Sequence, residues 1–159
     1  MVALENIYLL MNKSVYILSY SILADAEKAK DVLQDTFIKV AQSIHSYKAN
    51  TNAEAWICRI ARNLCYTEYS KAKRNISLEV YEGNIADKKN HEELWIQNIL
   101  LKKALLWLKP LEREIVVLFA IQGYKHREIA QIIKRPMGTV QRIYNKSIKK
   151  LRHYMEEQQ

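Results

Sequence analysis

The stretch GYKHREIAQIIKRPMGTVQRIYNKSIKKLR, residues 123–152, decides how the C-terminal part of the chain folds. After a helix-terminating glycine at its start, it contains two apolar segments of helical period, separated by a short turn at residues 134–137. The apolar and small residues at the expected crossing of the two helices are Ile129, Ala130, Ile133, Val140 and Ile143. This spacing predicts a helix-turn-helix.

The second helix of this motif, expected from Gly138 to about Met155, carries polar and basic side chains and no acidic one. Amide and guanidinium groups hydrogen-bond to base edges, whereas ammonium groups bind the phosphates of DNA whatever its base sequence. We therefore expect Gln141, Arg142 and Asn145, near the start of this helix, to contact bases. The full set of predicted DNA contacts is Lys125, Arg127, Thr139, Gln141, Arg142, Asn145, Lys146, Lys149, Lys150 and Arg152. A solvated basic face without a ligand is the alternative interpretation.

The composition of the whole chain favours a helical protein with a polyanionic partner. Its 159 residues include 3 Gly, 2 Pro and 9% aromatic residues, which are too few turn residues for a β-sandwich or barrel. A formal net charge of +8 and a pI near 9.4 favour nucleic acid, with an acidic membrane surface as the alternative. The longest apolar run, residues 115–121, is too short to cross a bilayer, so we expect a cytoplasmic protein without membrane insertion.

Three further helices are expected in the N-terminal part of the chain. The first ends near Ser21, and the second begins after a cap at Asp25. The third follows a polar loop, residues 46–52, and ends in a basic run, residues 71–74. Because Trp56 lies on the apolar stripe of this third helix, we expect its ring to pack in the core.

The helical period fails after Asn75, where the charge turns acidic, and such a change is typical of a linker. The predicted fold is therefore all-α, with two small helical domains, residues 1–75 and 93–159, joined by a flexible linker, residues 76–92. We expect the two domains to pack little against each other in the free protein.

The sequence contains no pattern typical of an enzyme. It has no glycine-rich phosphate loop and no nucleophile with a base at a recognisable spacing, so no catalytic residue is predicted. The four histidines are scattered without ligand spacing, and we expect neither a metal nor a cofactor. Cys58 and Cys65 are seven residues apart on one expected helix, about 10 Å, which is too far for a disulfide. Both are expected to be thiols in the helix core.

Three motifs resemble those of the extracytoplasmic-function (ECF) sigma factors of bacterial RNA polymerase. Residues 136–140, PMGTV, resemble the core of the family's promoter-reading helix-turn-helix. Residues 29–37, AKDVLQDTF, resemble its polymerase-binding helix, and residues 55–64, AWICRIARNL, resemble its strand-opening helix. The two domains match in the family's order, and the resemblance covers nearly the whole chain except the acidic linker.

The resemblance implies a dissociable subunit that directs core RNA polymerase to specific promoters and initiates transcription. Core polymerase and promoter DNA are the implied partners, together with an anti-sigma factor that holds both domains when the factor is idle. The implied polymerase contacts are Asp31, Gln34 and Asp35, which the helical period places on the polar side of their helix.

The resemblance also implies two DNA surfaces. The helix-turn-helix residues given above would bind the upstream promoter element. The downstream element would contact Tyr47, Lys48, Asn50, Arg62, Lys71, Lys73 and Arg74. Among these, an exposed Tyr47 beside Lys48 and Asn50 is the combination that holds an unstacked base.

Two other classes of protein remain open at this point. A helix-turn-helix regulator that does not act as a sigma factor would not need the N-terminal motifs, and a protein-interaction module would leave the basic last helix unused.

Two lysines depart from the family's pattern. Lys125 stands where a capping serine is common and cannot accept the capping hydrogen bonds. Lys134 stands where a turn glycine is common, and a left-handed conformation there costs about 1 kcal/mol.

Overall fold

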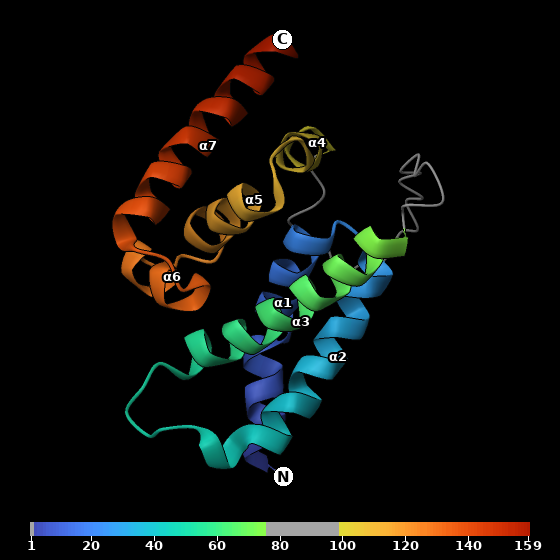
Figure 1. Cartoon of the computed structure of the whole chain (residues 1–159), viewed down its shortest axis with the longest axis vertical. Helices are drawn as coiled ribbons and strands as arrows, with labels where there is room; N and C mark the ends of the chain where they lie inside the picture. Colours follow the sequence, from blue (N-terminus) through green and yellow to red (C-terminus); the bar gives the residue numbers. More distant parts are fainter. Residues whose placement is uncertain (1, 76–98) are drawn as a thin grey trace.

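The computed structural model describes residues 2–75 and 99–159, and the predicted linker, residues 76–92, lies outside these ranges. Within them the chain forms helices and no strand, which confirms the all-α prediction (Figure 1). The N-terminal elements are α1 (Val2–Leu23), α2 (Ala26–Ser43), the short η1 (Ile44–Ser46) and α3 (Ala53–Asn75). The C-terminal elements are α4 (Ile99–Trp107), α5 (Pro110–Val116), the π-turn η3 (Val117–Ile121), α6 (His126–Ile133) and α7 (Met137–Glu157).

The N-terminal domain is a bundle of α1, α2 and α3, whose apolar stripes face one another. Asp25 begins α2 as predicted, because its carboxylate accepts a hydrogen bond from the Lys28 backbone N–H at 3.1 Å. Trp56 is half-buried against the core, in agreement with its place on the apolar stripe of α3. Cys58 and Cys65 are buried free thiols on α3, as expected.

The C-terminal domain contains the predicted helix-turn-helix, formed by α6 and α7. Gly123 adopts a left-handed φ of 76° after η3, and Lys134 adopts φ 53° and ψ 50° at the end of α6. Lys134 thus retains the left-handed conformation of the turn glycine that is common in the family, and Ile129, Ile133 and Val140 are buried where the two helices meet.

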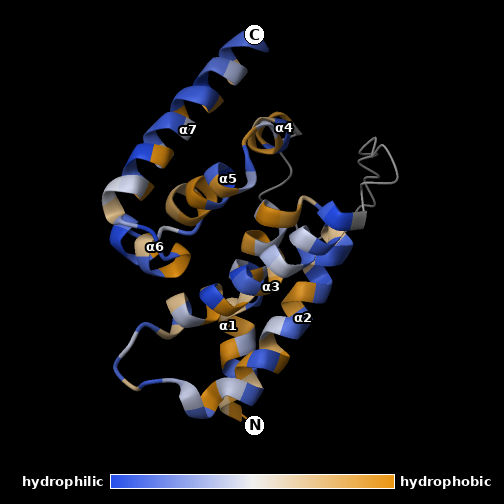
Figure 2. Ribbon diagram, viewed as in Figure 1, coloured by the Kyte–Doolittle hydropathy of each residue, from blue (hydrophilic) through white to orange (hydrophobic). Residues whose placement is uncertain are grey.

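The two domains share one hydrophobic core, so the prediction that they pack little against each other is wrong. Ile115 and Leu118 belong to the same buried cluster as Leu18 of α1 and Ala61 of α3. Helix α5 packs on α1, and α6 packs on α3 (Figure 1). Apolar residues line both α1 and α5 in Figure 2. Part of the apolar run around α5 thus covers the N-terminal bundle.

None of the helices in the described ranges combines the length and the apolar character needed to cross a membrane.

Candidate nucleic-acid and polymerase interfaces

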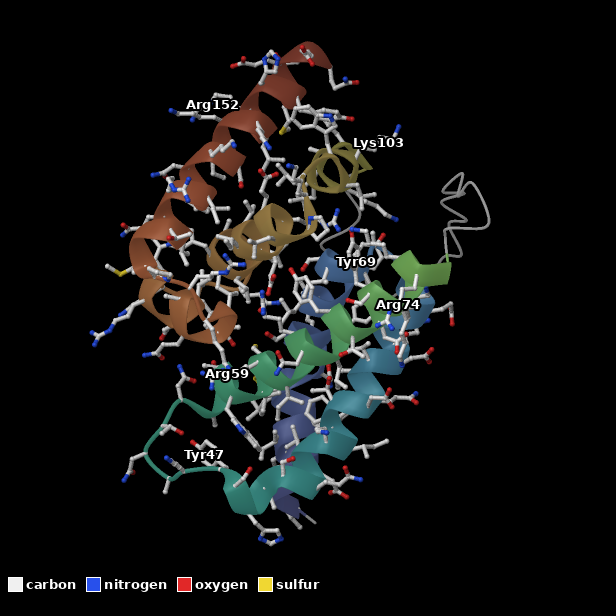
Figure 3. The ribbon with its side chains drawn as sticks, in the orientation of Figure 1. Tyr47, Arg59, Tyr69, Arg74, Lys103 and Arg152 are labelled. Atoms are coloured by element: carbon white, nitrogen blue, oxygen red, sulfur yellow. The ribbon has the colours of Figure 1, made fainter. Side chains whose placement is uncertain are left out.

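Helix α7 presents most of its predicted DNA contacts to solvent. It packs through Val140, Ser147 and Leu151, and these positions leave the opposite face of the helix uncovered. The exposed predicted contacts on α7 are Gln141, Arg142, Asn145, Lys146, Lys149 and Arg152, while Thr139 is half-buried. Arg152 points outward from α7, away from α4 and α5 (Figure 3). The face combines amides and a guanidinium near its start with lysines further along, which suits base reading followed by phosphate binding.

Lys150 differs from its neighbours because it forms an ion pair inside the domain. Its Nζ lies 2.6 Å from Oε1 of Glu112, which ties α7 to α5. Burial raises the pKa of Glu112, but hydrogen bonds from Lys150 and from the Lys109 backbone N–H outweigh it and hold the pKa below its ordinary value. The predicted phosphate contact of Lys150 therefore competes with a bond that stabilises the fold.

The start of α6 carries the exposed predicted contacts Lys125 and Arg127. The crowding of cations at this helix start is relieved by Glu128, whose carboxylate accepts from the Lys125 backbone N–H at 2.9 Å. His126 instead turns inward, with its ring stacked on Phe119 at a centroid distance of 4.2 Å and edge-on to Tyr144 at 5.2 Å. Sequence reasoning missed this stack, because its three rings come from three different elements.

The predicted polymerase contacts Asp31, Gln34 and Asp35 are exposed along one side of α2. They line a shallow groove together with Lys28 and with Glu68 of α3. Glu68 was not predicted, since only the packing of α3 beside α2 brings it there. The groove is rich in carboxylates and therefore suits a basic partner surface.

The loop between α2 and α3 holds Tyr47 less freely than expected (Figure 3). The Tyr47 ring is half-buried against Trp56, with centroids 5.1 Å apart, and its hydroxyl donates to the Thr51 carbonyl at 2.6 Å. Lys48 and Asn50 are exposed beside it, and Asn50 has a left-handed φ of 68°. The loop is thus a structured turn with an anchored aromatic ring, and base capture by Tyr47 stays a prediction.

The basic residues of α3 fall into two groups. Lys71, Lys73 and Arg74 are exposed near its C-terminal end, where Lys71 also pairs with Glu68 at 3.3 Å. Arg62 is committed to the other domain, because its Nε donates to Oε1 of Glu114 on α5 at 2.6 Å. The predicted phosphate contact of Arg62 is therefore occupied by a protein carboxylate in this conformation.

Glu114 is fully buried and accepts a second hydrogen bond from the Tyr66 hydroxyl of α3 at 2.8 Å. The Arg62 guanidinium also lies over the Tyr66 ring, 4.6 Å from its centroid. Burial raises the pKa of Glu114, although Arg62 and Tyr66 both act in the opposite direction. We call Arg62, Tyr66 and Glu114 the Glu114 cluster.

Arg113, next to Glu114 on α5, makes a second buried contact between the domains. Its guanidinium donates to the Ser21 carbonyl and, at 3.3 Å, to the Ile22 carbonyl in the last turn of α1. A cation at this position satisfies carbonyls that the helix itself leaves unpaired and is favoured by the helix dipole. Sequence reasoning missed this contact, since the charged run of α5 is typical of a solvated helix face.

The chain combines a basic helix-turn-helix with a second helical domain, which carries an acidic groove on α2 and cations on α3. This combination defines a two-domain helical DNA-binding protein. Within the described residues, no group of histidine, cysteine, aspartate or glutamate side chains is arranged to hold a metal ion.

Comparison with known proteins places this architecture in a family. The family model for sigma-70 region 2 matches residues 10–75, and that for sigma-70 region 4 matches residues 99–151. The ECF RNA polymerase sigma factor SigE of Mycolicibacterium smegmatis is 31% identical over 148 residues, which are 89% of this chain and 57% of the relative. SigW of Bacillus subtilis is 27% identical over 98% of this chain and 90% of its own length.

Two solved structures share the fold. The sigma factor RpoE of Bartonella quintana, crystallised with the anti-sigma factor NepR, has a TM-score of 0.86 at 23% identity, and the match covers 98% of both chains. CnrH, in complex with the cytosolic domain of CnrY, has a TM-score of 0.74 at 18% identity and covers 99% of this chain. The chain belongs to the ECF sigma factors, which confirms the family predicted from its three motifs.

Proposed function

We propose that this chain is a promoter-specificity subunit of bacterial RNA polymerase, which binds the core enzyme, directs it to promoters and initiates transcription. The observation that carries the proposal is the presence, in one chain and in sigma-factor order, of a region 2 domain and a basic region 4 domain. A helix-turn-helix regulator of another class would leave the first of these domains without a role.

Core polymerase docks on the acidic groove of α2. Support comes from the exposure of Asp31, Gln34 and Asp35, which need no rearrangement to meet basic residues of a partner. The docking is electrostatic at its rim, so its rate of formation falls as salt concentration rises.

Promoter DNA is bound at two places. Helix α7 reads the upstream element through Gln141, Arg142 and Asn145 and grips phosphates through its lysines. The Tyr47 loop and the cations of α3 hold the displaced strand of the downstream element. The chain performs no bond chemistry itself, since nucleotide addition belongs to the core enzyme, and it acts in the cytoplasm beside that enzyme.

An anti-sigma factor inhibits this chain by engaging both domains. Support comes from two structural neighbours: RpoE is in a co-crystal structure with the anti-sigma factor NepR, and CnrH is in complex with the cytosolic domain of CnrY.

Transcription with purified core polymerase on a promoter library tests the proposal. We expect run-off transcripts that depend on this chain and share an upstream and a downstream element. DNA binding without core polymerase, together with no transcript in its presence, would identify a regulator of another class instead.

A further inference from the structure

The PMGTV motif, residues 136–140, contains two residues whose identity the fold does not explain. The first is Met137, the residue with which α7 begins, whose apolar side chain is 47% exposed. It belongs to none of the hydrophobic clusters of the described chain. No other large apolar side chain of α7, every residue of which the structure describes, is exposed. Packing within the protein therefore gives no reason for an apolar residue at this position.

The second is Gly138. A Cβ built there would meet no heavy atom within 4 Å, apart from its chain neighbours and the backbone of its own helix. Its φ is not positive either, since Gly123 is the one glycine with a positive φ among the described residues. Glycine lowers the stability of a helix relative to alanine. The remaining use of glycine is to let a ligand approach the backbone closely.

Both residues lie at the end of α7 that the proposed promoter contact directs into the major groove. The preceding turn, with the exposed cations Lys134 and Arg135, lies at an outer edge of the molecule (Figure 1). Met137, Gln141 and Asn145 are spaced by four residues, so they follow one another along α7 at intervals of about 6 Å. Helical side chains lean toward the N-terminus, which directs Met137 toward this end of the helix. The exposed methionine thus continues the row of predicted base contacts.

The major groove offers such a side chain one apolar group, the C5-methyl of thymine. The other base edges present hydrogen-bond donors and acceptors, and burying one of these under a methionine without a partner costs free energy. A methionine side chain is flexible and polarisable, so it can adapt its shape to a methyl group. Met137 therefore favours thymine in two ways, by apolar contact and by the exclusion of polar base edges.

We propose that Met137 packs on the C5-methyl group of a thymine in the upstream promoter element, and that Gly138 leaves room for the DNA at this contact. The inference rests on the proposed function, in which α7 enters the major groove. It adds a specificity-determining residue that recognises an apolar group, beside the predicted Gln141, Arg142 and Asn145, which recognise polar ones.

The test removes the methyl group from the DNA and the thioether from the protein. The upstream element is first selected from a DNA library with holoenzyme that contains the full-length chain. Each of its thymines is then replaced in turn by deoxyuridine, which lacks only the C5-methyl group. The affinity of holoenzyme for these duplexes is measured with wild type, Met137→Ala and Met137→Leu. Leu10→Ala is the matched control, because it truncates an exposed apolar side chain of the N-terminal domain.

At one thymine we expect wild type to lose about fourfold in affinity on replacement by deoxyuridine, as the loss of one buried methyl group predicts. Met137→Ala should lose at least as much on the unmodified element and nothing more at that deoxyuridine, because the methyl group then has no partner. Met137→Leu should retain a preference for thymine, since leucine is apolar. Leu10→Ala should show the same difference between thymine and deoxyuridine as wild type.

Gly138→Ala separates the DNA contact from folding. The protein has room for the added Cβ, and alanine is the better helix former, so thermal melting should stay equal or rise. Affinity for the unmodified element should nevertheless fall by about fivefold or more, because the added methyl group overpacks the contact with DNA. Affinity equal to that of wild type would overturn the role of Gly138.

Three results would overturn the inference about Met137. Equal losses at every deoxyuridine in Met137→Ala and wild type would show that this side chain contacts no thymine methyl group. A selected element in which no thymine methyl group contributes to affinity would show the same. Weaker binding of Met137→Ala to core polymerase without DNA, with unchanged thymine preference, would assign the exposed methionine to the polymerase interface.

Met137→Gln provides a second reading if Met137→Ala melts at a lower temperature. Glutamine keeps the length and the helix propensity of the side chain but ends in a polar group, so most of the preference for thymine should disappear. A preference equal to that of wild type would overturn the inference. If wild type directs core polymerase to no promoter, the proposed function fails. The same scan on DNA selected by the full-length chain alone then still decides whether Met137 reads a thymine.

Discussion

Helices α3 and α7 are both basic, but they present their cations in opposite ways. On α7 the cations lie mainly on the solvent side, and Lys150 alone among its predicted contacts forms an ion pair that the described structure records. On α3 the central Arg59 and Arg62 contact the other domain, and the exposed cations are confined to its end. The helix proposed to read DNA thus has most of its predicted contacts exposed in the free protein, while the central arginines of the helix proposed to hold opened DNA are occupied by the other domain.

The largest effect is expected from Arg62→Ala. The substitution leaves the buried Glu114 without its cation, and we expect a loss of about 3 kcal/mol in the free energy of unfolding, measured by chemical denaturation. Lys73→Ala, on the exposed end of α3, is the control and should leave the unfolding midpoint unchanged. Equal stability of the two variants would mean that the central and the terminal cations of α3 contribute alike to the free energy of unfolding.

The acidic groove of α2 should contribute to affinity and not to stability. Charge reversal at Asp31 and Asp35, combined with Gln34→Ala, should weaken binding to core polymerase by about tenfold or more. Thermal melting should stay close to wild type, since all three side chains are exposed. Undiminished binding by this variant would remove the groove from the polymerase interface.

On α7, base reading and phosphate binding should separate along the helix. Arg142→Ala should cost about 1 to 3 kcal/mol on the preferred upstream element and little on scrambled DNA. Lys149→Ala should weaken both equally and reduce the salt slope by about one. The two variants are compared in holoenzyme. If each variant loses the same affinity for the preferred and the scrambled sequence, then α7 binds phosphates without reading bases.

The sequence was sufficient to predict the structural features that depend on residues close together in the chain. The Asp25 cap and the helix-turn-helix both follow from local spacing, and the structure contains each of them. The partners of Arg113 and Glu114 could not be predicted, because they lie far away in the chain and become neighbours only when α5 packs on the N-terminal bundle. A charged run on a helix otherwise indicates a solvated face.

The same limit applies to Tyr47. Its place in a polar loop indicated an exposed ring, but the neighbouring Trp56 covers part of it, and the ring is anchored through its hydroxyl. Tyr47→Ala should still reduce open-complex formation by roughly tenfold, since stacking of a base on an aromatic ring is worth about 1 to 3 kcal/mol. Permanganate reactivity of promoter thymines measures this loss, and Tyr47→Phe separates stacking from anchoring: it should keep the opening if the ring itself stacks. Identical reactivity in Tyr47→Ala and wild type would remove the loop from strand opening.

The smallest effect concerns two carboxylates on one helix. Glu112 and Glu114 each have a cation 2.6 Å away, yet the pKa of Glu112 is lowered and that of Glu114 is raised. The stabilisation due to Glu112 is present above its ordinary pKa and is lost as the pH falls through its folded value. The contribution of Glu114 has the opposite sign, because a raised folded pKa favours the protonated form, and it is lost as the pH rises through that value.

These opposite signs give a matched test of burial. The free energy of unfolding of wild type minus that of Glu112→Ala should grow by less than about 1 kcal/mol between pH 3.5 and pH 5. Wild type minus Glu114→Ala should shrink as the pH rises above the ordinary carboxyl range. Urea unfolding across this series measures both slopes. If the two differences change in the same direction, then burial does not distinguish the interdomain carboxylate on α5 from its neighbour, and the contrast between the contacts of α3 and α7 loses its physical basis.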